Sequence, residues 1–121
     1  MKICISSTGE SLNSLVDPRF GRAAYFLIGD NEEENFKALK NEGVPMMHGA
    51  GISASQIVAN EKVDTVITGN IGPNAYNALK SASIKIYTVD FNKTVKQVLK
   101  QFNKGELKEA KNATGPGFEM S

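Results

Sequence analysis

Apolar residues recur along this chain in two patterns, which predict an alternation of strands and helices. Short runs rich in β-branched and aliphatic residues have the composition of buried strands. Longer segments carry apolar residues three and four positions apart, which places them on one helix face. The runs predict strands over residues 2–6, 24–28, 35–42, 63–68 and 84–89. The periodic segments predict helices over residues 52–62, from Pro73 through Ala82, and from Asn92 or Lys93 to about Lys104.

Residues 35–42 are the segment whose type the apolar pattern leaves open. Phe36, Ala38 and Leu39 could serve a helix as well as a strand. Polar turn residues come before this segment and Pro45 follows it, and proline disfavours helical backbone in the residue before it. We therefore predict a third strand here.

The order of the elements predicts a three-layer α/β fold. Strands joined by helices in the second half of the chain require right-handed parallel crossovers, whereas the short connections between the first strands suit antiparallel pairing. We expect a mixed five-stranded sheet with helices on both faces, in a single domain over residues 1–111. The apolar period fades beyond Gly105, and the glycines around Pro116 predict a flexible tail over residues 112–121.

Composition and charge narrow the function classes. The 14 Lys and Arg residues nearly balance the 13 Asp and Glu residues, so the chain has no global field that would collect nucleic acid or acidic lipid. Any anion must be held locally. No apolar run approaches the roughly 18 residues of a membrane span, and the start does not read as a signal peptide. We therefore expect a cytoplasmic protein with no membrane partner.

Cys4 is the only cysteine of the chain and lies in the middle of the first predicted strand. One cysteine excludes an internal disulfide, and one chain cannot supply the four thiolates that commonly hold an iron–sulfur cluster. A central strand also desolvates a thiolate and raises its pKa. We expect Cys4 to be a core residue.

Glycine-rich turns mark a candidate anion site. Ligands of such sheets collect at the carboxyl ends of the parallel strands, where helix starts present backbone N–H groups. Residues 6–9, 48–53 and 69–74 should meet at that edge. The candidate binding residues there are Gly49, Gly51, Gly69, Asn70, Gly72 and Asn74. The alternative is that the glycines only form tight turns, with Gly72 as the cap residue and Pro73 at the first helical position.

The segment from Asp17 to Arg22 is the densest motif. Arg19 and Arg22 carry planar guanidinium groups that bind carboxylate, phosphate or oxo-anions bidentately, Phe20 can anchor the motif in the core, and Gly21 allows a turn. The alternative is a structural turn in which Asp17 pairs with one of the arginines.

His48 is the only histidine and precedes the glycine-rich turn at residues 49–51. It is a candidate metal ligand or proton carrier, with an ordinary loop residue as the alternative.

Catalytic motifs are missing from the sequence. The segment from Gly49 to Ala54 has GxGxxA spacing, but it does not follow the first strand of a βαβ unit, and Asp64 comes too early to bind a ribose. There is no P-loop, no Ser/His/Asp order and no constellation of acids. We therefore expect a protein that binds rather than catalyses.

The same segments resemble the dinitrogenase iron–molybdenum cofactor biosynthesis domain family. The likeness lies in DPRFGRA (residues 17–23), HGAGI (residues 48–52), and VD through ITGNIGPNA (residues 63–75), and it extends over residues 1 to about 108. The family fold is ribonuclease-H-like. The resemblance implies non-catalytic carriage of an iron–sulfur or iron–molybdenum cluster or its precursor, with cofactor-assembly proteins as partners.

Carried over by motif, the family's cluster region would fall at Arg19, Phe20, Gly21, Arg22 and His48, beside the turn at residues 69–74. This chain has Ala23 where some members have a cysteine, which removes a soft ligand.

Two alternatives stay open beside the cluster carrier. One is a binding module for another small anion. The other is a protein or nucleic-acid interaction module that uses the lysine-rich last helix and tail. These lysines are Lys93, Lys96, Lys100, Lys104, Lys108 and Lys111. No aromatic residue is interleaved on that polar face to stack a base, which disfavours nucleic acid.

Overall fold

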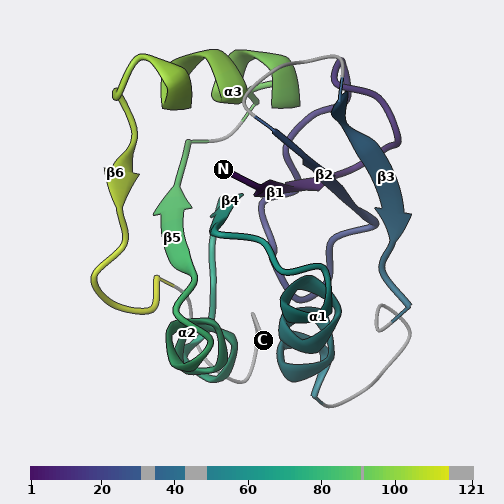
Figure 1. The fold of residues 1–121 in the computed structure, drawn as a ribbon. Helices are drawn as coiled ribbons and strands as arrows, with labels where there is room; N and C mark the ends of the chain where they lie inside the picture. Colours follow the sequence, from purple (N-terminus) through teal and green to yellow (C-terminus); the bar gives the residue numbers. More distant parts are fainter. Residues whose placement is uncertain (31–34, 43–48, 91, 115–121) are drawn as a thin grey trace.

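The computed structural model describes residues 1–30, 35–42, 49–90 and 92–114, which form a mixed six-stranded sheet with three helices (Figure 1). The elements are β1 (Ile3–Ser7), β2 (Tyr25–Gly29), β3 (Lys37–Lys40), α1 (Ala50–Asn60), β4 (Thr65–Thr68), α2 (Pro73–Ser81), β5 (Lys85–Thr88), α3 (Val95–Asn103) and β6 (Lys108–Glu109). The sheet order is β3-β2-β1-β4-β5-β6. Within these residues no helix is long and apolar enough to cross a membrane.

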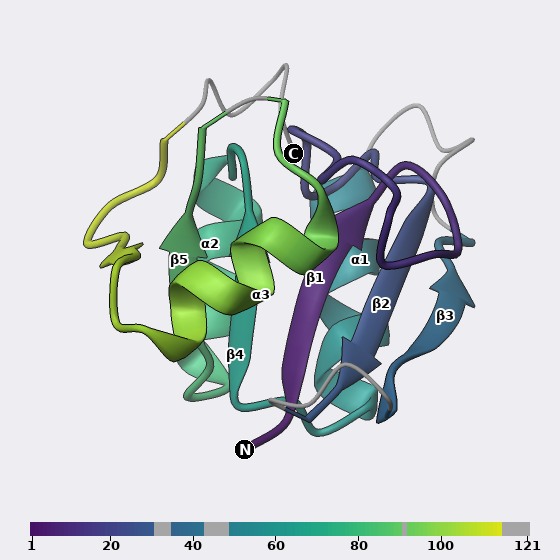
Figure 2. The ribbon, with the colours of Figure 1, turned by 90° about the horizontal axis from the view of Figure 1, so that it is seen from above.

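The sheet lies between two helical layers, as the sequence predicts. β1 pairs antiparallel with β2 and parallel with β4, and β4 pairs parallel with β5. α1 and α2 cover one face and α3 covers the other (Figure 2). Side chains alternate across β1 because successive residues of a strand point to opposite faces: Cys4 packs in the cluster with α1 and α2, while Ile3 and Ile5 pack with α3.

The prediction of five strands is wrong, because β6 adds a sixth. β6 pairs antiparallel with β5 through Lys108 and Glu109. Both residues are charged and exposed, so the strand has no apolar signature. Ala110, which follows it, is buried and donates its N–H to the carbonyl oxygen of Ile86 at 2.7 Å. The ribonuclease-H-like classification of the fold stays a prediction.

The C-terminal segment is attached to the turn after β4. The N–H of Thr114 donates to the carbonyl oxygen of Ile71 at 2.9 Å, and the N–H of Ile71 donates to Thr114 Oγ1 at 2.9 Å. These two bonds hold the chain three residues beyond the predicted domain end at residue 111. The rest of the predicted tail, residues 115–121, lies outside the described residues.

Residues 15–20 are inserted at the carboxyl edge between β1 and the turn after β4. Parallel pairing of the two strands extends only to Ile5 and its partner Ile67. Beyond that point the N–H of Asp17 donates to the carbonyl oxygen of Ser6 at 3.0 Å, and the N–H of Asn70 donates to that of Pro18 at 2.6 Å. We call residues 15–20 the edge insert.

Gly69 is required by the edge insert. A Cβ at this position would lie 2.7 Å from the Cα and 2.9 Å from the carbonyl oxygen of Pro18. Both are backbone atoms, so the clash cannot be relieved by rotating a side chain. The turn after β4 therefore needs glycine for contact with its own chain.

We predict that Gly69→Ala lowers the free energy of unfolding by about 1–3 kcal/mol, the usual cost of overpacking. It should also shift the NMR amide signals of Arg19 and Asn70, because the insert must move. Gly105→Ala is the control: Gly105 has φ 73° with nothing within 4 Å of its Cβ position, so the cost is about 1 kcal/mol of left-handed strain. Urea titration measures both, and unchanged Arg19 and Asn70 signals in Gly69→Ala would contradict the contact.

We also predict that the chain is docked as far as Thr114. Deleting residues 115–121 should leave the Tm nearly unchanged, while deleting residues 112–121 should lower it by about 3–6 °C, since two hydrogen bonds to Ile71 are lost. Thr114→Val removes only the hydroxyl acceptor, so its Tm should lie between those of the two deletion variants. Equal Tm values for both deletions would show that the Thr114 contact does not stabilise the fold.

Candidate functional site

The structure brings two of the predicted binding segments together at the carboxyl edge. Arg19 and Asn70 form an isolated parallel bridge. In it, the N–H of Phe20 donates to the carbonyl oxygen of Asn70 at 3.1 Å. The arginine motif and the turn that leads into α2 are thus one hydrogen-bonded unit.

Asp17 holds the arginine motif in shape. Its carboxylate is buried and accepts from the N–H of Arg19 at 3.1 Å and of Ala24 at 3.4 Å. Its Oδ1 also lies 4.0 Å from Nε of Arg19. This is the pairing that the turn interpretation predicts. The Arg19 side chain is 54% exposed, and an exposed ion pair at this distance contributes little, so its guanidinium group can still reach an anion in solvent.

A small polar network fixes the motif to the strand ends beneath it. Ser6 Oγ lies 2.8 Å from the carbonyl oxygen of Asp17 and 2.8 Å from Thr68 Oγ1. A hydroxyl has one hydrogen and a carbonyl can only accept, so Ser6 donates to Asp17 and accepts from Thr68. Ser6 and Thr68 are completely buried, so these groups serve the scaffold and do not face a ligand.

Phe20 and Ala23 lie in the core. The Phe20 ring is fully buried, and its centroid is 5.4 Å from that of Phe26. Ala23 is also fully buried, so a side chain at this position faces the interior. Asn41 Nδ2 donates to the carbonyl oxygens of Gly21 at 3.1 Å and Ala23 at 2.9 Å, which ties the loop to β3. Of the charged residues of the motif, Asp17 is buried, whereas Arg19 is exposed and Arg22 is partly exposed.

The helix starts at this edge differ in what satisfies their N–H groups. α3 begins at a complete capping box, in which Thr94 Oγ1 accepts from the N–H of Gln97. The N–H groups of Val95 and Lys96 each donate at 2.9 Å to carbonyl oxygens of the loop at residues 12–14. The start of α3 is therefore satisfied by the protein itself.

α1 and α2 begin instead at glycines, which have no side chain to cap a helix. Gly49 is the N-cap of α1 with φ 76°, and Gly72 is the N-cap of α2 with Pro73 following, as the sequence predicts. α1 begins at Ala50, two residues before the predicted start. Gly51 is buried in its first turn and accepts from Ser55 Oγ at 2.7 Å, while Asn74 is exposed in the first turn of α2. The first N–H groups of α1 and α2 are therefore not covered by a side chain of the cap residue, which is a property that a backbone anion site needs.

Metal ligands are sparse in the part of the chain that the structure describes. Residues 1–30, 35–42, 49–90 and 92–114 contain no group of three or more His, Cys, Asp or Glu residues that could hold a metal ion. Cys4 is fully buried, as predicted, and burial raises the pKa of its thiol far above the usual range, with the charge of Glu61 adding to the effect. The predicted ligand His48 lies outside the described residues.

Two hollows lie away from this edge motif, on the side of the sheet that α3 covers. Asp90, Gln101 and Glu106 are among the residues that line them, and none of these belongs to the predicted binding set. The position of Asp90 just beyond β5 is a signal that could have found them, because ligands collect at the carboxyl ends of parallel strands. The lysines of α3 were predicted only as an alternative interaction face.

Comparisons with known proteins agree with this architecture. An uncharacterized protein of Methanocaldococcus jannaschii is 31% identical over 100 residues, which is 80% of this chain and 84% of that protein. The apo form of the orange protein from Desulfovibrio gigas superposes with a TM-score of 0.90 at 35% identity, covering 94% of this chain and 96% of that one. A Thermotoga protein of the DUF35 family, provisionally named as a NifB protein, superposes with a TM-score of 0.82 at 34% identity, covering 96% and 98%.

A family model covers most of the chain. Residues 1–105 match the model of the dinitrogenase iron-molybdenum cofactor family. The matched range includes the arginine motif and both glycine-capped helix starts, so the resemblance found in the sequence is confirmed. The chain belongs to the dinitrogenase iron-molybdenum cofactor family.

Proposed function

We propose that this protein binds and carries a preassembled iron–sulfur or iron–molybdenum cluster, or its precursor, without catalysing a reaction. The observation that carries the proposal is the bridge between Arg19 and Asn70. It joins a motif with two guanidinium groups to the turn that begins α2 at a glycine cap. Guanidinium groups and helix N–H groups both stabilise negative charge, which is the charge of a sulfide-rich cluster.

The side chains that could bind a metal favour a cluster that is carried over a metal centre that stays in the protein. The described residues offer no cluster of metal ligands, and the Cys4 thiol is sealed in the core. A cluster that arrives assembled needs charge, N–H groups directed at its sulfur atoms and one or two terminal ligands. In the proposal His48 supplies a terminal ligand.

The proposed binding residues follow from this division of roles. In the proposal Phe20 holds the motif from the core, and the other residues form the segments that surround the cargo. They are Arg19, Gly21, Arg22, His48, Gly49, Gly51, Gly69, Asn70, Gly72 and Asn74.

The place of action in this proposal is the cytoplasm, with cofactor-assembly proteins as donors and acceptors of the cluster. A second candidate cargo is another small anion, which the glycine-capped starts of α1 and α2 would also suit.

We predict that Arg19→Gln combined with Arg22→Gln weakens cluster binding by about tenfold or more, because charge-assisted contacts are lost. The apo variant should stay within about 1 kcal/mol of wild-type stability, the usual range for surface changes. The measurement is anaerobic gel filtration after incubation with iron–molybdenum cofactor or a synthetic iron–sulfur cluster, followed by metal analysis and visible absorption. Lys62→Gln combined with Lys85→Gln, two exposed lysines elsewhere, is the control with equal net charge. Equal binding by both double variants would overturn the arginine site.

We further predict that His48→Ala weakens cluster binding, since a terminal ligand is removed, while Cys4→Ser leaves the bound metal per chain unchanged and lowers the Tm. A serine hydroxyl buried in place of a thiol costs stability without touching an exposed site. Zn²⁺ titration by calorimetry should show weak binding at most, because zinc prefers three or four convergent ligands. Normal cluster binding by His48→Ala together with loss in Cys4→Ser would reverse these assignments.

A further inference from the structure

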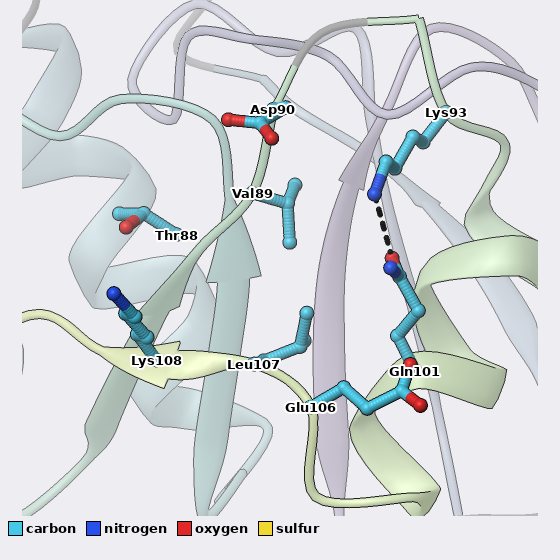
Figure 3. Close-up of a pocket in the computed structure, with 8 residues that line it drawn as sticks. All are labelled: Thr88, Val89, Asp90, Lys93, Gln101, Glu106, Leu107 and Lys108. Atoms are coloured by element: carbon cyan, nitrogen blue, oxygen red, sulfur yellow. Dashed lines mark hydrogen bonds between the residues drawn. The ribbon is translucent and has the colours of Figure 1, made fainter.

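Two adjoining hollows lie beside α3. One, of about 380 Å³, lies at the carboxyl end of β5 (Figure 3). The other, of about 490 Å³, lies along α3. They share Lys93, Gln101 and Glu106. Together they form one groove of the size that small-molecule sites have, and we call it the α3 groove.

The wall of the α3 groove is held in place by the protein. Lys93 Nζ donates to Gln101 Oε1 at 3.2 Å, the bond drawn in Figure 3. Val89 and Leu107 point toward one another in the middle of the hollow and pack against the core cluster that contains α3. The start of α3 is pinned by its capping box and by the loop at residues 12–14. The groove therefore has an apolar floor and a preformed polar side.

Charge is unevenly distributed along the groove. The hollow along α3 is basic, because Lys93, Lys100 and Lys104 line it together with a single acid, Glu106. Figure 3 shows Glu106 beside Gln101, across the hollow at the end of β5 from Asp90, so the two acids lie apart. Figure 3 also shows the Lys108 side chain directed away from Val89 and Leu107. Lys100 and Lys104 therefore share their hollow with one carboxylate acceptor.

We propose that the α3 groove binds a small phosphorylated sugar or polyol. The ammonium groups of Lys100 and Lys104 take the phosphate. Carboxylates are strong acceptors, so Glu106 accepts hydrogen bonds from hydroxyl groups, and Gln101 lines the same hollow as these three residues. This is a second site, separate from the proposed cluster site, and it does not depend on the cargo of that site.

The lining also argues against larger anions. Glu106 beside the lysines, and Asp90 at the end of β5, would each repel a second phosphate, which disfavours polyphosphates and nucleic acid strands. Among the described residues that line the groove none is aromatic, so these residues offer no platform on which a base could stack. One anionic group attached to a neutral, hydroxylated body fits two lysines with a single carboxylate beside them.

The test compares ribose 5-phosphate, ribose, inorganic phosphate, AMP and O-phosphoethanolamine by NMR titration of the full chain labelled with ¹⁵N. We expect ribose 5-phosphate to bind about tenfold more tightly than inorganic phosphate, as an added hydrogen bond to a charged group allows. The side-chain amide signals of Gln97 and Gln101 should shift, and those of Arg19 and Asn70 should not. Tighter binding of AMP or of O-phosphoethanolamine than of ribose 5-phosphate would overturn the assignment of Glu106 to hydroxyl groups.

Variants of the lysines and of Glu106 separate phosphate binding from hydroxyl binding. Lys100→Gln combined with Lys104→Gln should weaken binding of both ribose 5-phosphate and inorganic phosphate by about tenfold. Glu106→Gln should abolish the preference for ribose 5-phosphate while inorganic phosphate binds at least as tightly. All three residues are exposed, so these variants should keep the fold. Lys62→Gln combined with Lys85→Gln is again the charge-matched control. Among the double variants, the affinity for ribose 5-phosphate should fall only in the Lys100→Gln, Lys104→Gln variant. An equal loss in the control variant, or in the Arg19→Gln, Arg22→Gln variant, would show that the α3 groove is not the binding site.

Discussion

The hydrogen-bonded insertion of residues 15–20 between β1 and the turn after β4 is the constraint on which the functional edge depends. It closes the gap that opens where the two parallel strands part beyond Ile5 and Ile67. It uses the interior side of Ser6, Asp17 and Thr68 for mutual hydrogen bonds. The insert therefore leaves the Arg19 guanidinium and the turn around Asn70 as the chemistry available at this surface.

The three helices that begin near this edge differ in the groups that bind their first backbone N–H groups. Protein carbonyl oxygens and the Thr94 hydroxyl already occupy the first N–H groups of α3. α1 and α2 begin at glycines that offer no side-chain cap. In the two proposals an anion would therefore meet backbone N–H groups at α1 and α2, but only side chains at α3. The cluster site and the α3 groove consequently rest on different chemistry, although both lie toward the carboxyl ends of strands.

Local sequence signals were sufficient for most of the fold and for few details of the site. The β-branched run ending at Thr68 and the Gly72-Pro73 pair predict β4 and the start of α2 because the causes are local. β6 could not be found this way, because Lys108 and Glu109 are paired by a distant strand and carry no burial pattern. Gly69 shows the same limit: its spacing suggests room for a ligand, whereas the neighbour that excludes a Cβ is Pro18.

The net charge of the chain does not show where its charged side chains lie, and their local arrangement decides what binds. The chain is nearly neutral, which correctly argues against a global field, yet α3 gathers Lys100 and Lys104 opposite Glu106 in one groove. Because salt screens exposed charges beyond about 10 Å, a ligand at the surface responds to these few neighbours and hardly to the total. A near-neutral protein can therefore hold an anion locally without collecting anions over its whole surface, which is what the proposed carriage of a charged cluster would require.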